Sequence, residues 1–108
     1  MSRDEAGSLD ERLAKVLGEL SDVDRADAAG GAELRRGSRL FAVLGQGSIE
    51  VQLDAAVAAA ARRTPNVSAS SRGPDWVLFR PKTIDRFALD RAEAWLRSAH
   101  RLAADARR

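Results

Sequence analysis

Few residue types in this chain of 108 residues are suited to catalysis. His100 is the only imidazole, and the absence of cysteine excludes disulfides, thiolate zinc sites and thiol redox chemistry within the chain. Because a metal site needs several ligands and no second histidine exists, His100 is better interpreted as a boundary residue bonded to a nearby acid or to water. A triad of Ser70 or Ser71 with His100 and Asp75 can be drawn on paper, but no nucleophile-elbow motif accompanies it. We therefore expect no enzyme, no metal and no cofactor.

Two further patterns resemble functional motifs but have simpler structural explanations. Residues 45–47 (Gly-Gln-Gly) could be imagined as a phosphate loop, yet no Lys-Ser or Lys-Thr follows and the next residues alternate as a strand does. A hairpin turn explains them better. Asp85 and Asp90 could form an acid/base pair, but a helix cap and a surface charge account for them.

The basic residues are the one set with a candidate binding role. Net charge is only +2, but residues 1–54 carry 7 Lys or Arg against 11 Asp or Glu, whereas residues 55–108 carry 11 against 5. If several cations converge on one face, they make salt-dependent contacts with phosphates without reading bases. Codon bias explains the excess equally well, because 16 of the 18 basic residues are Arg and Ala is abundant. The candidate contact residues are Arg35, Arg36, Arg62, Arg63, Arg72, Trp76 and Arg80.

Both tryptophans allow two interpretations. Trp76 opens a run of four large apolar residues, 76–79, that is typical of a buried or central strand. Core packing is therefore its default role, and stacking against a base is the alternative. Trp95 shares a helical apolar stripe with Leu96 and Ala99, so core packing is again the default, with a homodimer anchor as the alternative.

Three helices are expected from capping residues and apolar periodicity. The first begins at Ser8, where Ser8 and Glu11 form a capping box, and ends near residue 20. A short alanine-rich helix follows Asp54 and ends before Thr64-Pro65. A long helix begins at Asp85 or Thr83 and runs to about residue 104.

Four or five strands are expected between these helices. They are a short edge strand at 33–36, a hairpin formed by 39–44 and 48–53, and a second hairpin formed by 66–71 and 76–80 across the turn at 72–75. Residues 21–31 are expected to be a loop with weak helical tendency at 26–29.

These elements predict a single α+β domain over residues 8–104. Its mainly antiparallel sheet has four or five strands in two hairpins, with the N-terminal, short middle and long C-terminal helices packed chiefly on one face. Residues 1–7 are expected to be disordered and residues 105–108 frayed. The acidic N-terminus is unlike a signal peptide and no apolar run is long enough to span a bilayer, so we expect a cytoplasmic protein without a membrane partner.

Three segments together resemble a known family. The Gly-Gly pair with the Leu-Arg-Arg-Gly strand and turn (residues 30–37), the Gly-Pro-Asp-Trp-Val-Leu-Phe strand (73–79) and the Trp-Leu-Arg-Ser-Ala stretch (95–99) resemble the luciferase-domain family of small bacterial proteins. The element order is also similar to that of the MmcQ/YjbR family, whose members are often labelled DNA-binding. The luciferase label implies no flavin chemistry by itself. This chain has Ala42 and Leu44 where such proteins carry histidines, so the resemblance implies no imidazole-dependent role there.

The functional prediction is a non-enzymatic binding or interaction module that resembles luciferase-domain proteins, acts as a monomer or homodimer, and binds a protein or a small ligand. The alternative is a sequence-nonspecific nucleic-acid-binding domain that uses the Arg-rich C-terminal half. A third hypothesis is a minor subunit of an enzyme, without catalytic residues of its own.

Overall fold

One antiparallel sheet of six strands organises the molecule, in the order β1-β2-β3-β4-β6-β5. The computed structural model describes residues 3–105, and the side chains of residues 8–104. The helices are α1 (Arg3–Glu19), α2 (Ala55–Ala61) and α3 (Arg86–Asp105). The strands are β1 (Asp24–Ala28), β2 (Gly31–Arg36), β3 (Arg39–Gly45), β4 (Ser48–Gln52), β5 (Val67–Ser70) and β6 (Gly73–Phe79). The predicted α+β class is confirmed.

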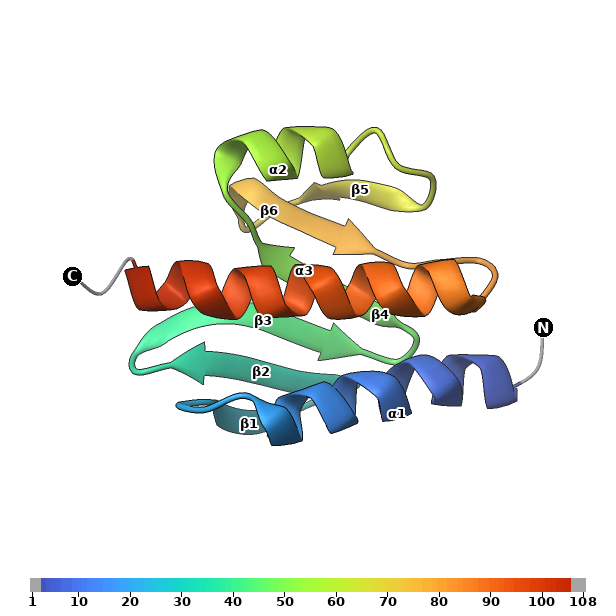
Figure 1. The fold of residues 1–108 in the computed structure, drawn as a ribbon, viewed down its shortest axis with the longest axis horizontal. Helices are drawn as coiled ribbons and strands as arrows, with labels where there is room; N and C mark the ends of the chain where they lie inside the picture. Colours follow the sequence, from blue (N-terminus) through green and yellow to red (C-terminus); the bar gives the residue numbers. More distant parts are fainter. Residues whose placement is uncertain (1–2, 106–108) are drawn as a thin grey trace.

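The helices cover one face of the sheet (Figure 1). α3 crosses β2, β3 and β4, α1 packs beside α3, and α2 packs against β6. Ala58 and Ala61 of α2 belong to the same hydrophobic core as the buried residues of α3. No helix of the described residues packs on the opposite face, which we call the open face.

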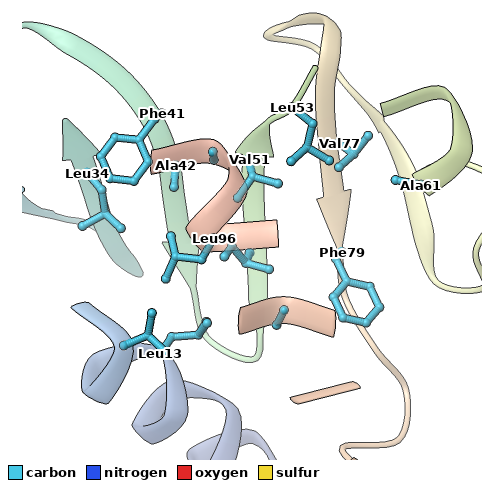
Figure 2. Packing of buried hydrophobic residues seen from close by; sticks show 14 of the residues in the cluster. Leu13, Leu34, Phe41, Ala42, Val51, Leu53, Ala61, Val77, Phe79 and Leu96 are labelled. Carbon is cyan, nitrogen blue, oxygen red and sulfur yellow. The ribbon is translucent and has the colours of Figure 1, made fainter. Parts of the chain in front are cut away.

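Strand alternation builds the core beneath the helices. One row of buried side chains crosses four strands: Leu34, Ala42, Val51 and Val77. Leu13 of α1 and Leu96 of α3 close over this row from the helical side, as Figure 2 shows. Because side chains of a strand alternate between faces, the neighbouring row of Glu33, Val43, Glu50 and Leu78 is left on the open face.

Two helix starts follow the predicted capping residues, and one does not. Asp54 accepts a hydrogen bond from the Ala56 amide at 3.1 Å, and Asp85 accepts one from the Ala88 amide at 2.9 Å. The expected start of the first helix at Ser8 is wrong, because α1 begins at Arg3. The acidic and alanine residues at positions 4–6 favour a helical first turn, so the helix continues past the apparent cap.

The sheet has six strands rather than the four or five predicted, and the strand that was not predicted is the first, β1. Residues 21–31 were expected to form a loop, but β1 pairs along its length with β2, and β2 is therefore not an edge strand. All five β1 side chains are exposed, so no apolar alternation signals the strand. The Gly-Gly pair makes the hairpin: Gly30 has φ of 80°, and a Cβ on Gly31 would lie 1.7 Å from the Leu44 carbonyl oxygen. The other strand pairings occur as predicted.

Two expectations concern the ends of the chain and membranes. The disorder expected at residues 1–7 and the fraying expected at 105–108 fall largely outside the described side chains and stay predictions. Within the described residues, no helix is both long and apolar enough to cross a bilayer.

Candidate functional site

The predicted contact residues do not form one patch. Arg35 and Arg36 end β2 and Arg72 lies in the β5–β6 turn, and these two places are at one end of the molecule (left in Figure 1). Arg62 reaches this end as well, since it donates to the Pro74 carbonyl oxygen at 2.7 Å. Arg80 directly follows β6, whose last residue lies at the other end (right in Figure 1).

Arg72 and Trp76 belong to a closed polar network on the open face. Glu50 lies in the middle of this face with a side chain 18% exposed, and it accepts hydrogen bonds from the Ser70 hydroxyl and, at 3.0 Å, from Arg72 Nε. The Arg72 guanidinium lies 5.8 Å from the centroid of the Trp76 ring. Trp76 is only 7% exposed, so neither of its ring faces is open to a ligand. The network stabilises the open face rather than offering a surface.

The two arginines at the end of β2 also have carboxylate partners. Arg35 pairs with Glu33 at 2.9 Å, and Arg36 lies 3.7 Å from the Asp22 carboxylate. Arg36 Nη1 also donates to the His100 carbonyl oxygen at 3.0 Å. Because these cations are neutralised within the chain, they offer little to an anionic ligand.

His100 is a structural residue whose hydrogen bonds define its tautomer. The ring is 7% exposed and packs edge-on against Phe41. Nδ1 lies 3.2 Å from Arg36 Nη1, and Nε2 lies 2.6 Å from the Ser21 carbonyl oxygen. A guanidinium can only donate, so Nδ1 accepts and Nε2 carries the proton donated to Ser21. The partners are thus an arginine and a backbone carbonyl, rather than the acid or water that we expected.

A cluster of ion pairs joins α1 to α3. Glu93 accepts hydrogen bonds from Arg12 Nε at 2.6 Å and from Arg97 Nε at 2.9 Å. Arg12 also pairs with Asp90 at 2.9 Å, and Arg97 pairs with Glu19 at 2.5 Å. The hydrogen bonds from Arg12 and then from Arg97 lower the pKa of Glu93. The pKa of Arg12 is raised by its hydrogen bonds to Glu93 and then Asp90, and the pKa of Arg97 is raised by its hydrogen bonds to Glu19 and then Glu93. We call these five residues the α1–α3 ion-pair cluster.

A second group of cations has no such partners. We call it the basic end: Arg63, Arg80, Lys82, Arg86 and Arg91. Among the described residues, none of the five lies within 4.0 Å of a carboxylate oxygen. The Arg80 amide donates to the Asn66 carbonyl oxygen at 3.0 Å, which ties the end of β6 to the start of β5. The connection to α3 and the α2–β5 connection consequently lie at the same end of the molecule, right in Figure 1.

The basic end also carries an exposed aromatic ring. Phe87 is 67% exposed, the highest value for a large apolar side chain in the described residues. Its ring centroid lies 5.8 Å from the Arg86 guanidinium carbon. Beside it is a hollow of about 150 Å³, whose lining residues are Pro65, Asn66, Phe79, Pro81, Thr83, Asp85, Phe87, Ala88 and Arg91. Arg91 lines this hollow, and Lys82 and Arg86 are adjacent in sequence to its lining residues. Arg80 instead lines a separate hollow of about 240 Å³, together with Glu50 and Leu78 of the open face.

A larger hollow, of about 320 Å³, lies where α1 meets the β1–β2 and β3–β4 turns. Two of its three polar or charged side chains are already engaged. The Asp10 carboxylate accepts a hydrogen bond from the Gly47 amide at 3.2 Å, and Arg25 pairs with Asp27 at 3.1 Å. The hollow is otherwise lined mainly by Gly and Ala, so it offers little to recognise a ligand.

The structure thus places two of the predicted contact residues, Arg63 and Arg80, at the same end of the molecule as Lys82. Sequence reasoning did not select the other residues at this end, which are Arg86, Phe87 and Arg91. A signal for Phe87 was present, because it directly precedes Ala88 at the start of the apolar stripe and is flanked by Arg86.

Trp95 packs edge-on against Phe79, with ring centroids 5.3 Å apart, as its core interpretation predicts. Comparisons with protein-family models, curated proteins and solved structures find no match to this chain.

Proposed function

We propose that this protein is a small non-enzymatic binding module that holds an anionic partner at the basic end. The observation that supports this is a contrast in pairing: five cations without a carboxylate partner lie at the same end of the molecule as the most exposed aromatic ring, whereas Arg35, Arg36 and Arg72 at the opposite end are paired with carboxylates. Like charges gathered on one surface repel one another and contribute little to the stability of the folded state. Binding of an anionic ligand accounts for such a cluster.

The local electrostatics add to this positive surface. The N-terminus of α3 lies here, and its free amides add partial positive charge. Two carboxylates lie nearby, and each is engaged. Asp85 caps α3 through the Ala88 amide, and Asp90 pairs with Arg12. All five cations also lie in the basic C-terminal half that the sequence singles out.

The test is a comparison of two double variants that remove the same charge. Arg86→Gln with Arg91→Gln neutralises two cations of the basic end, and Lys15→Gln with Arg101→Gln neutralises two unpaired cations elsewhere. Binding of fluorescein-labelled heparin is followed by anisotropy at about 50 mM salt. We expect the first pair to weaken binding about tenfold and the second less than about twofold.

Two outcomes contradict the proposal. Equal weakening by the two double variants would mean that heparin responds to net charge alone. No binding of the unaltered protein at low salt would mean that the basic end holds no polyanion.

A further inference from the structure

We infer that the partner at the basic end is a single-stranded nucleic acid, with one base stacked on the Phe87 ring and the flanking phosphates held by the cations around it. This inference rests on the proposed function and adds the partner's chemical class. It depends on the aromatic ring and on the polar hollow beside it, and not on the positive charge alone.

Phe87 is placed as a stacking platform. It lies in the first turn of α3, and its 67% exposure shows that the core beneath does not use it. The Arg86 guanidinium, 5.8 Å from the ring centroid, is close enough for a cation–π contact with the ring. Single-strand binding sites combine such aromatic faces with cations that follow the backbone, and stacking tolerates any base sequence.

The hollow beside the ring suits the edge of a base. Its volume of about 150 Å³ is small, and its lining mixes the ring of Phe79 and two prolines with polar side chains of Asn66 and Thr83. These polar groups can exchange hydrogen bonds with the donors and acceptors on a base edge. A free phosphate or sulfate polymer would use the cations but not this hollow.

Two other anionic partners fit less well. In a duplex both faces of each base are stacked within the helix, so Phe87 has no base face to contact. A membrane surface favours several exposed apolar side chains together with cations. The other large apolar side chain that is exposed among the described residues, Val57, lies on α2 and lines a different hollow with Ser98 and Leu102. Phe87 would insert alone, surrounded by polar groups.

The experiment measures anisotropy of a labelled thymidine strand of about 12 nucleotides at about 50 mM and about 200 mM salt. Phe87→Ala should weaken binding about tenfold with an unchanged salt slope, because stacking is lost and no phosphate contact is. Phe87→Trp should keep binding within about twofold. Val57→Ala is the matched control and should have no effect. Arg86→Gln with Arg91→Gln should instead reduce the salt slope. Circular dichroism of each variant checks that it is folded.

The outcomes separate this inference from the proposed function. If heparin binding depends on the basic end but Phe87→Ala leaves strand binding unchanged, the inference is overturned and the binding module stands. Equal affinity for a duplex of the same length also overturns it. So does Phe87-dependent binding to vesicles with anionic lipids without binding to the strand. If neither heparin nor the strand binds, both proposals fail.

Discussion

The long helix α3 carries arginines of two kinds, and the difference between them indicates their roles. Arg97 is held by Glu93 and Glu19 and joins α3 to α1. Arg86 and Arg91, in the first turns of the same helix, have no carboxylate partner in the described part of the chain. The number of arginines therefore says little about binding. What distinguishes a structural arginine from an available one is the presence of an acid within reach.

The largest expected effect is on the free energy of unfolding, and it distinguishes a substitution in the buried part of α3 from one at its exposed start. Leu96 is 0% exposed and Phe87 is 67% exposed on the same helix. Leu96→Ala should lower the free energy of unfolding by about 2–5 kcal/mol, because it leaves a cavity under the helix. Phe87→Ala should change it by less than about 0.5 kcal/mol. Urea unfolding measures both, and a similar loss in the two variants would contradict the assignment of Phe87 as a surface residue.

The second effect concerns the α1–α3 ion-pair cluster. Glu93 holds both Arg12 and Arg97, so Glu93→Gln leaves two guanidiniums with weaker acceptors. The Glu93 side chain is 23% exposed, and solvent screening keeps the expected loss of unfolding free energy to about 1 kcal/mol. Arg91→Gln, two residues earlier, should have no measurable effect on unfolding. If Arg91→Gln destabilises the protein as much, the contrast between paired and available arginines is wrong.

A smaller effect appears in the pH dependence of stability. Arg12 and Arg97 lower the pKa of Glu93 in the folded protein. The unfolded chain therefore takes up this proton first as pH falls, and stability that is present at neutral pH is lost progressively below about pH 5. In Glu93→Gln this part of the loss is absent. Unfolding followed from pH 7 to pH 3 should show the difference between protein and variant shrinking toward acid, and a constant difference would contradict the pKa shift.

The sequence predicted most of the fold because its signals are strong and local. Asp54 and Asp85 cap helices where expected, and alternation in residues 48–53 marks β4. β1 was missed because a strand exposed along its whole length carries no apolar pattern, and its pairing depends on tertiary contact with β2.

The site was harder to predict because pairing is a property of three-dimensional contacts. Arg35 and Arg72 look like Arg80 in the sequence, but the first two have a glutamate within 3.0 Å. The partner of Arg35 is Glu33, two residues away along β2, whereas Arg72 in the β5–β6 turn reaches Glu50 on β4. Phe87 was overlooked because a phenylalanine in an amphipathic helix is expected in the core. Only its 67% exposure shows otherwise.

The smallest predicted effect is on heparin binding, and it tests whether Asp90 can change its partner from a paired arginine to an available one. Asp90 is four residues after Arg86 on α3, close enough for an ion pair, yet it pairs with Arg12 of α1. Arg12→Gln should release Asp90 toward Arg86 and weaken heparin binding about twofold, without altering any residue of the basic end. Lys15→Gln removes the same charge from the same helix and should change binding less. If the two variants weaken binding equally, Asp90 does not move between the clusters. If Arg12→Gln alone weakens it, the pairing within α1 and α3 controls how much charge the basic end presents.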